Sequence, residues 1–285
     1  AGIRTFFNGP ESFTNDNLHL LGPTPEVENF YVACGMNSKG IAASGGLGKI
    51  LADWVIDGHP SGEITETDVR RNNAVQTTDT YVKARIPEAL GHTYAMHWPF
   101  YQYQTARNLI QSPLHQALLD QGACFGEVGG YERPNWFARN GAPAEYDYSY
   151  KRQNWFEFSA AEHTAVRENV GVYDISSFGK FDVTGKDAVT TLQNLSCANI
   201  DVDHGQVVYT QWLNERGGIE ADLTIARLAA NRFWVITGIA SLNRDWWRLK
   251  KNLLGQTEIT DVTTQHACLS VQGPDARRLL QHITD

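Results

Sequence analysis

The sequence has few cysteines and no long apolar run. Its four cysteines, Cys34, Cys124, Cys197 and Cys268, lie far apart, and none forms the CxxC spacing of a zinc-ligand pair or a thioredoxin-type motif. Cys34 and Cys268 lie in apolar, strand-like segments, where free thiols are commonly buried, so we expect a reducing, intracellular environment. No apolar stretch reaches the roughly 18 residues that a membrane-spanning helix needs, so we predict no membrane span.

The sequence also lacks an excess of positive charge. Its formal net charge is −8 and its pI is about 5.6, whereas nucleic-acid-binding domains usually carry a basic surface. The longest basic cluster, residues 244–251, is interleaved with apolar residues in the manner of one amphipathic helix. The histidines show no HxxxH or HxH spacing. We therefore predict neither nucleic-acid binding nor a metal site.

The 285 residues suffice for two domains, or for one large domain and part of another. Hydrophobic residues make up 42% and charged residues 20%, which is ordinary for a globular protein. No secretory signal pattern is present, and the first residue is Ala1 rather than Met. We expect the chain to be a segment of a longer protein.

The first region of the chain, to about residue 60, predicts a strand, a glycine-rich turn and a helix. Residues 28–36 (ENFYVACGM) are apolar and aromatic, which indicates a buried strand. From Ile41 onward apolar residues recur at helical spacing, and Gly58 and Pro60 end the helix. The next region, 61–112, predicts helical stretches interrupted at Pro87, Gly91 and Pro99, which favours a covering or linking element.

The third region, 113–285, mixes helices and strands without strict alternation, so we predict an α+β fold. Residues 159–171 predict a helix with Ser159 as N-cap and Glu162 completing a capping box. The preceding residues 132–156 predict an aromatic loop. Strands are predicted at 206–214 and 219–228, joined as a hairpin across the loop 214–218, and the apolar residues 232–238 predict a third strand covered on both faces.

The glycine-rich turn before the first predicted helix is one candidate site. A strand, a glycine-rich turn and a helix together present backbone N–H groups to an anion. The spacing differs from GxGxxG, and no acidic residue follows at the end of a second strand. The alternative interpretation is a helix packed closely on a strand through small residues.

The hairpin carries the second candidate site. Alternation along residues 219–226 places Glu220, Asp222 and Thr224 on a polar face opposite an apolar one. The plain interpretation is a strand with one face in water; the aromatic Tyr209 and Trp212 on the preceding strand favour a cleft instead. With a four-residue loop Asp222 would pair with Tyr209 and share its face; with a five-residue loop it would pair with Thr210, and Tyr209 would face away.

Three stretches resemble one known family in the same order. Residues 29–55 (NFYVACGMNSKGIAASGGLGKILADWV) resemble the C-terminal flavin-contacting part of D-amino-acid-oxidase-like, FAD-dependent amine dehydrogenases. Residues 114–137 and 171–188 resemble the start of an aminomethyltransferase-like folate-binding domain, and LNERGGIEADLTIARL and ACLSVQGPDARRLLQ continue it. The whole chain resembles the FAD-dependent dimethylglycine/sarcosine dehydrogenase family.

The resemblance implies three parts and two cofactors, FAD and tetrahydrofolate. Residues 1–60 would be the C-terminal end of the FAD-dependent oxidoreductase domain, 61–112 a linker domain, and 113–285 the first part of the folate-binding domain. It implies that FAD oxidises an N-methylated glycine and passes electrons to an acceptor, while tetrahydrofolate receives the one-carbon unit as 5,10-methylenetetrahydrofolate. Asp222 would be the catalytic acid at the folate. The implied cofactor contacts are Gly35, Met36, Asn37, Ser38, Gly40, Ile41, Tyr209, Asp222 and Thr237.

The resemblance also implies limits and an alternative. The dinucleotide fingerprint, the histidine that tethers FAD and the second half of the folate domain are absent from these 285 residues. We therefore expect that these 285 residues alone neither retain FAD nor catalyse the reaction. Flavin absorbance from the isolated chain would contradict this expectation. The implied location is the bacterial cytoplasm or the mitochondrial matrix. The alternative is a non-catalytic homologue resembling the regulatory subunit of pyruvate dehydrogenase phosphatase.

Overall fold

The computed structural model describes residues 2–284 and divides into two compact units. Unit 1 comprises the residues up to His97 with Gln104–Ala106, and unit 2 comprises Trp98–Tyr103 and the residues from Arg107 onward. The two units are defined by contacts within the chain and do not test the predicted domain limits. The limits at residues 60 and 112 therefore stay predictions.

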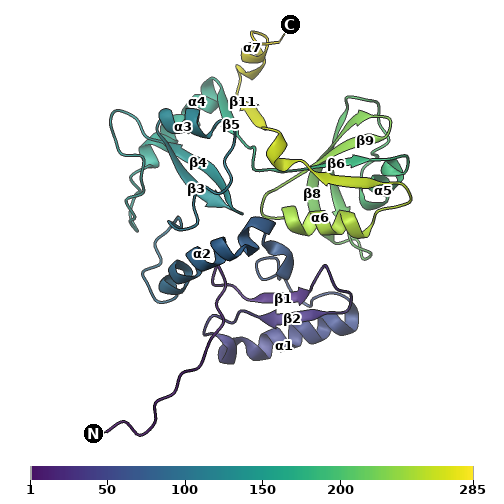
Figure 1. The fold of residues 1–285 in the computed structure, drawn as a ribbon. Helices are drawn as coiled ribbons and strands as arrows, with labels where there is room; N and C mark the ends of the chain where they lie inside the picture. Colours follow the sequence, from purple (N-terminus) through teal and green to yellow (C-terminus); the bar gives the residue numbers. More distant parts are fainter. Residues whose placement is uncertain (1, 285) are drawn as a thin grey trace. The chain divides into compact units, whose positions relative to one another are not determined.

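Unit 1 is a two-stranded sheet with helices (Figure 1). Its elements are β1 (Leu20–Pro23), β2 (Tyr31–Cys34), α1 (Gly40–Asp57), the 3₁₀ turns η1 (Val69–Arg71) and η2 (Ala74–Thr77), and α2 (Asp79–His92). The predicted strand, turn and helix are present, and α1 ends at Gly58, whose φ of 76° suits glycine and whose N–H bonds the Trp54 carbonyl at 3.0 Å. Trp54 lies against Gly22, where a β-carbon would come within 2.5 Å of the ring.

Three predictions for unit 1 are wrong. The strand β2 is only half-buried at its start and exposed at its end, and Cys34 is exposed rather than buried. Four residues paired on one side with β1 leave too little cover for a buried strand. Pro87 and Gly91 both lie inside α2 rather than interrupting it. Tyr81, Arg85 and Ala89, spaced four residues apart, bury one face of α2, and that packing outweighs the hydrogen bond that proline removes.

Unit 2 is built around a five-stranded antiparallel sheet in the order β10-β6-β9-β8-β7. Its elements are α3 (His115–Asp120), β3 (Ala123–Val128), β4 (Tyr131–Phe137), α4 (Phe156–Glu168), β5 (Gly171–Asp174), β6 (Gly179–Thr184), α5 (Ala188–Leu195), β7 (Val207–Leu213), β8 (Ile219–Ala229), β9 (Arg232–Thr237), α6 (Leu242–Lys251), β10 (Glu258–Asp261), η3 (Thr263–Gln265), β11 (Leu269–Gln272) and α7 (Ala276–Leu280). The mixture of antiparallel sheet and helices confirms the predicted α+β class.

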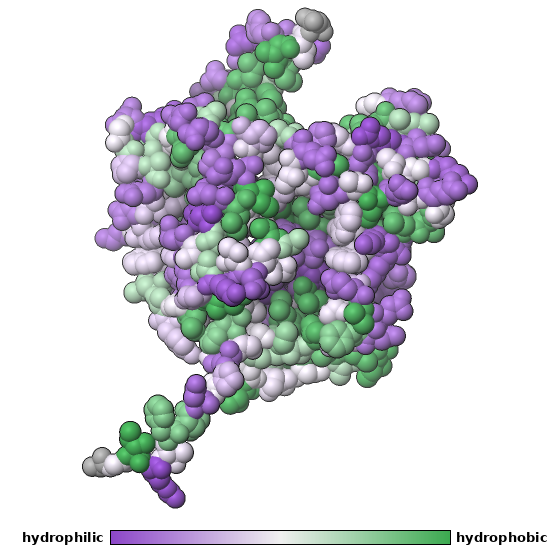
Figure 2. Space-filling model, viewed as in Figure 1, coloured by the Kyte–Doolittle hydropathy of each residue, from purple (hydrophilic) through white to green (hydrophobic). Residues whose placement is uncertain are grey.

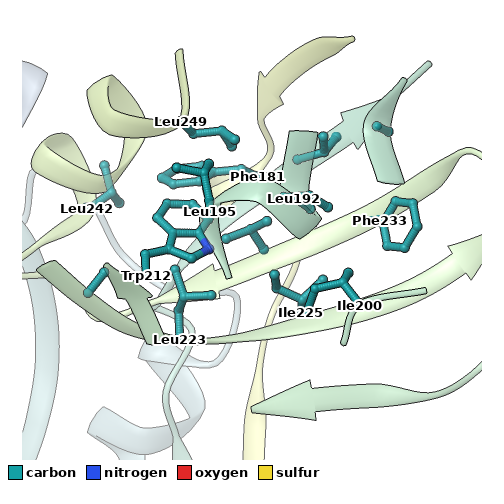
Figure 3. Close-up of a cluster of buried hydrophobic side chains, with 14 of the residues drawn as sticks. Phe181, Leu192, Leu195, Ile200, Trp212, Leu223, Ile225, Phe233, Leu242 and Leu249 are labelled. Atoms are coloured by element: carbon teal, nitrogen blue, oxygen red, sulfur yellow. The ribbon is translucent and has the colours of Figure 1, made fainter. Parts of the chain in front are cut away.

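One face of this sheet forms the core with α5 and α6 (Figure 3). Alternate residues of the strands contribute to it, and so do Leu192 and Leu195 from α5 and Leu242 and Leu249 from α6. Trp212 is fully buried there, and its indole N–H donates to Ser196 Oγ at 3.1 Å, so its one polar atom is satisfied. The opposite face carries the alternate set of side chains, including Asp222.

Three further predictions for unit 2 are wrong. The strand β9 alternates between buried and half-buried residues, because only one of its faces lies in the core. The region 132–156 is not all loop, since it begins with most of β4, which pairs with β3. Helix α4 begins at Phe156, so Ser159 lies within its first turn and is not an N-cap. Glu162 instead accepts a hydrogen bond from the Phe137 N–H at 3.0 Å, which ties α4 to the end of β4.

The surface of the described residues carries exposed apolar groups in several places. The extended segment that begins near the N-terminus includes exposed Ile3, Phe6 and Phe7, and apolar and polar residues follow one another along it in Figure 2. Of the other cysteines, Cys124 is buried, Cys197 is exposed and Cys268 is half-buried, so the predicted burial of Cys268 is met only in part. Among residues 2–284 no helix is both long and apolar enough to cross a membrane.

Candidate functional site

The β7–β8 hairpin brings Tyr209 and Asp222 together on the sheet face opposite the core. The Tyr209 hydroxyl donates a hydrogen bond to Asp222 Oδ2 at 3.0 Å. Tyr209 is 63% exposed, and Asp222 is exposed too. An aromatic ring and a carboxylate thus stand side by side on an open polar face, with Thr224 directly across the ladder from Tyr209. The predicted cleft is therefore wrong, since the pair is exposed and Trp212 lies in the core on the other face. That arrangement can stack on a flat ring and accept a hydrogen bond from it.

Neither predicted register is correct. The loop has five residues, yet Asp222 pairs with Gln211 rather than Thr210, and Tyr209 pairs with Thr224. The cause is a β-bulge, in which Leu213 pairs with Ile219 and Trp212 with Ala221. Glu220 is therefore the extra residue on β8. Without it a five-residue loop would place Asp222 opposite Thr210, which is buried on the core face.

The bulged Glu220 is bonded by two neighbours, one at its side chain and one at its backbone carbonyl. Asn214 Nδ2 donates to Glu220 Oε1 at 2.8 Å, from the start of the hairpin loop. Arg244 of α6 donates from its terminal guanidinium nitrogen to the Glu220 backbone carbonyl at 2.8 Å. Arg248, one turn further along α6, donates to the Leu213 carbonyl at the other end of the loop. Helix α6 thus contacts both ends of the loop that precedes Asp222.

Thr237 does not join Tyr209 and Asp222. It lies at the end of β9 on the core face, 1% exposed, and its hydroxyl donates to Asp245 Oδ2 in α6. Its predicted role as a cofactor contact stays a prediction, but its hydroxyl is directed at Asp245 and away from the exposed polar face.

Asp245 is a buried carboxylate in contact with polar groups. Its side chain is 1% exposed, and Oδ1 lies 3.8 Å from Arg244 Nε. Burial raises the pKa of Asp245 above its ordinary value, although the hydrogen bond from Thr237 and the charge of Arg244 act in the opposite direction. Within the described residues Asp245 Oδ1 accepts no hydrogen bond.

The glycine-rich turn of unit 1 is shaped by backbone conformation. Gly35, Asn37 and Ser38 have φ of 65°, 49° and 60°, the left-handed region that non-glycine residues adopt at a cost. Asn37 is fully buried, and its side chain is occupied within the turn. It accepts from the Thr14 N–H at 2.8 Å and donates to the Gly35 carbonyl at 2.6 Å. The amide side chain therefore holds the turn from within and is not free to bind a ligand.

The remaining predicted flavin contacts flank this turn. Ser38 is exposed, with its hydroxyl donating to Glu11 at 2.8 Å, and Met36 is half-buried. Gly40 begins α1, and a β-carbon there would lie 3.2 Å from the Met36 β-carbon. Ile41 is 99% exposed. No acidic side chain lies in the first turn of α1, so its N–H groups and positive dipole end face no neighbouring carboxylate from that turn.

Family models assign most of the chain. Residues 57–112 match the FAD dependent oxidoreductase central domain. Residues 114–285 match the GCVT N-terminal domain, and this match covers more than half of the sequence. The chain belongs to the GCVT family. The combination of a flavin oxidoreductase domain with a GCVT domain confirms the predicted dimethylglycine/sarcosine dehydrogenase resemblance and the fold class.

Relatives of this GCVT-family chain include enzymes and a regulatory protein. It is 46% identical over 285 residues to 4-methylaminobutanoate oxidase (formaldehyde-forming) of Paenarthrobacter nicotinovorans, with 100% of the chain and 35% of the oxidase aligned. It is 36% identical over 289 residues to the mitochondrial pyruvate dehydrogenase phosphatase regulatory subunit of Mus musculus, covering 99% and 33%. It is 33% identical over 326 residues to the mitochondrial sarcosine dehydrogenase of Homo sapiens, covering 100% and 36%. The chain spans about a third of the length of these relatives.

A solved structure agrees with the family. The aminomethyltransferase T of the Bartonella henselae glycine cleavage system matches with a TM-score of 0.50 and 26% identity, over 61% of this chain and 44% of that one. Against this fold, sequence reasoning missed Arg244 and the bulge at Glu220. The basic residues of 244–251 were the only hint in the sequence. Long basic side chains that lie along an apolar helix face can place their donors near backbone carbonyls.

Proposed function

We propose that this GCVT-family chain is part of an FAD-dependent enzyme that oxidatively removes an N-methyl group from an amino acid and passes the carbon to tetrahydrofolate, giving 5,10-methylenetetrahydrofolate. The observation that carries the proposal is the hydrogen-bonded Tyr209–Asp222 pair on an open face of the GCVT sheet. Dimethylglycine and sarcosine are the proposed substrates. The 46% identity to a 4-methylaminobutanoate oxidase adds a longer N-methyl amino acid as a third.

Asp222 is proposed to act as the catalytic acid and base at the folate amine. A carboxylate beside an exposed ring can accept a proton from an amine that attacks an electrophilic one-carbon unit. The Tyr209 hydroxyl occupies one oxygen of Asp222 and so fixes the direction of the other. The ring of Tyr209 would offer a flat apolar surface to the pterin. Thr237 is not assigned to this step, since its hydroxyl bonds the buried Asp245.

The turn from Gly35 to Ile41 is proposed to meet the flavin through its backbone. When bound, FAD would accept the hydride equivalent from the N-methyl group. The residues of this chain would supply N–H groups at the start of α1, where the helix dipole favours negative charge. Asn37 would hold the turn in its left-handed conformation, because its amide bonds the turn from within.

The natural protein at full length tests the proposal. Dimethylglycine, sarcosine and 4-methylaminobutanoate are each assayed for amine-dependent dye reduction, for free formaldehyde and for methylenetetrahydrofolate, with and without tetrahydrofolate. Asp222→Asn should leave dye reduction within about twofold and lower methylenetetrahydrofolate formation by roughly a hundredfold, in the range that general acid–base catalysis contributes. Equal loss of both activities, or equal retention of both, would contradict the assignment of Asp222.

A second candidate is a non-catalytic regulatory role. The 36% identity to the pyruvate dehydrogenase phosphatase regulatory subunit favours it, and this identity exceeds that to sarcosine dehydrogenase. The same assay discriminates the two, since a regulatory protein would oxidise none of the amines. The proposed partners of the enzyme are the small N-methylated substrate and an electron acceptor for the reduced flavin. The proposed location is the bacterial cytoplasm or the mitochondrial matrix, in line with the bacterial source of one relative and the mitochondrial names of two.

A further inference from the structure

We propose that Arg244 is a positioning residue for Asp222, because it holds the β-bulge at Glu220 that turns Asp222 to the open face of the sheet. This inference rests on the proposed role of Asp222 in the folate-dependent step. Arg244 lies on the core side of the sheet and does not share the face of Asp222, so its action on that residue passes through the backbone.

The bulge decides where Asp222 points. Side chains alternate between the two faces of a strand, so one extra residue between Ile219 and Ala221 exchanges the faces of everything that follows. With Glu220 as the extra residue, Asp222 shares the face of Tyr209. A regular ladder from the same loop would direct Asp222 toward the buried Thr210 instead.

Arg244 donates to the Glu220 carbonyl at a point where β9 does not pair with β8. In the described chain the pairing of β8 with β9 begins at Thr224 and Ile236, so the segment that carries Glu220 and Asp222 is paired with β7 alone. The Glu220 carbonyl accepts from Arg244 at 2.8 Å. A backbone carbonyl at a bulge would otherwise need water, and a charged donor forms the stronger bond.

The guanidinium of Arg244 lies beside a buried carboxylate, in an electrostatic contact that is not a hydrogen bond. Its side chain is about one-fifth exposed, and Asp245 Oδ1 lies 3.8 Å from its Nε. Asp245 in turn accepts the hydrogen bond of Thr237 at the end of β9. The contacts therefore run from Thr237 through Asp245 and Arg244 to Glu220. These contacts connect the end of β9 to the bulge in β8, and they assign Thr237 a structural role.

The cost of this arrangement argues that it serves the site. A carboxylate that is 1% exposed, with one oxygen that accepts no hydrogen bond among the described residues, is disfavoured by burial. Apolar residues in its place would stabilise the helix–sheet contact as well or better. The burial of Asp245 places a carboxylate next to Arg244, which bonds the Glu220 carbonyl at the bulge.

The test uses the natural full-length protein with sarcosine or dimethylglycine as the amine. The variant Arg244→Met keeps the length of the side chain and removes its donors. We expect amine-dependent dye reduction within about twofold of the wild type and a shift of product from methylenetetrahydrofolate toward free formaldehyde by roughly tenfold or more, since small misplacements of a catalytic group have effects of this order. Hydrogen exchange of the backbone amides of residues 213–222 should rise in the same variant.

Arg227→Met is the matched control. Arg227 lies on β8 itself and, like Arg244 of α6, donates to backbone carbonyls, those of Val202 and Ala230, but it is on the far side of Asp222 from the bulge. It should change neither the product ratio nor the exchange of residues 213–222. Arg244→Lys retains one donor, should fold if Arg244→Met does not, and should show an intermediate product ratio.

The outcomes separate the two proposals. A wild-type protein that forms methylenetetrahydrofolate, with folded Arg244 variants of unchanged product ratio, would overturn the positioning role alone. An equal shift in Arg227→Met would overturn it as well, because the effect would then be a general loosening of β8. A wild-type protein that forms no methylenetetrahydrofolate from any of the amines would overturn the proposed function, and the role of Arg244 with it.

Discussion

Tyr209 and Asp222 lie on diagonal positions of the β7–β8 ladder, and the Tyr209 hydroxyl donates to Asp222 Oδ2 at 3.0 Å. Each is directly opposite another residue, Tyr209 opposite Thr224 and Asp222 opposite Gln211. A tyrosine is long enough to cross this diagonal. The bond therefore links neighbouring rungs on one face of the sheet, and it engages one of the two oxygens of the exposed Asp222 carboxylate.

Tyr209→Phe is predicted to weaken the folate-dependent step and to leave stability almost unchanged. The bond is exposed, so its loss should alter the free energy of unfolding by less than about 1 kcal/mol. Loss of the fixed carboxylate direction should lower methylenetetrahydrofolate formation by roughly fivefold, which corresponds to about 1 kcal/mol. Chemical denaturation and the product assay measure the two effects. Tyr173→Phe, at another exposed strand tyrosine, is the control that should alter neither.

Glu132→Gln is predicted to destabilise unit 2 strongly at neutral pH. Glu132 is 1% exposed at its side chain and forms an ion pair with Arg107 at 2.6 Å, and it also accepts from the Asn108 N–H. Removing one partner of a buried pair costs about 3 kcal/mol or more. Glu157→Gln, in the exposed pair with Arg152, should cost less than about 0.5 kcal/mol. Equal effects of the two variants in urea unfolding would show that the Glu132 pair is not buried as described.

The pH dependence of this pair has a defined sign. Burial raises the pKa of Glu132, but the hydrogen bonds from Arg107 and the Asn108 backbone and the charge of Arg107 together lower it below its ordinary value. The stability that the carboxylate contributes is thus present above the unfolded pKa of about 4.3 and is lost as pH falls through the lower folded pKa. The difference in unfolding free energy between wild type and Glu132→Gln should shrink on acidification below about pH 4.

The sequence predicted the hairpin, the helix that starts near Ile41 and ends at Gly58, and the α+β class, because each depends on a local pattern. Alternation along β8 placed Asp222 opposite the apolar set, and Gly58 ended α1 as expected. The bulge was not predictable in this way. At the bulge the Glu220 carbonyl accepts a hydrogen bond from Arg244, which lies 24 positions later in the chain. A local sequence pattern cannot predict so distant a partner.

The candidate site residues also divide into those placed by local pairing and those placed by contacts between distant parts of the chain. Tyr209 and Asp222 are adjacent because strand neighbours in a hairpin are close in sequence. Thr237 lies on the opposite face, since the alternation of β9 is set by its pairing with β6 and β8. Asn37 was expected near a cofactor, but its amide is turned inward by Thr14, 23 residues earlier. Contacts across such separations arise from tertiary packing rather than from local propensity.

Asp245→Asn is predicted to have a pH dependence opposite to that of Glu132→Gln. Burial raises the pKa of Asp245, and the groups facing the carboxylate are Thr237, Ser241, Arg244 and Arg248. For an acid with a raised folded pKa, stability is fully present below the unfolded pKa of about 3.9 and is lost as pH rises through the folded value. The asparagine variant should therefore gain stability relative to the wild type between about pH 4 and pH 7. Urea unfolding at both pH values measures this, and a difference that is constant with pH would contradict it.

Gly185→Ala is predicted to be among the most destabilising substitutions that add a single methyl group. Gly185 follows β6 with a φ of 119°, and a β-carbon there would lie 1.8 Å from the Gln256 carbonyl oxygen, so the backbone before β10 would have to move. Strain and overpacking together should cost about 3 kcal/mol or more. Gly205→Ala is the matched control, because its φ of 82° is also left-handed but no atom lies within 4 Å of the added carbon. It should cost only about 1 kcal/mol, the strain alone. Thermal and urea unfolding of both variants separate the clash from the strain, and equal losses would mean that the Gln256 carbonyl does not approach Gly185.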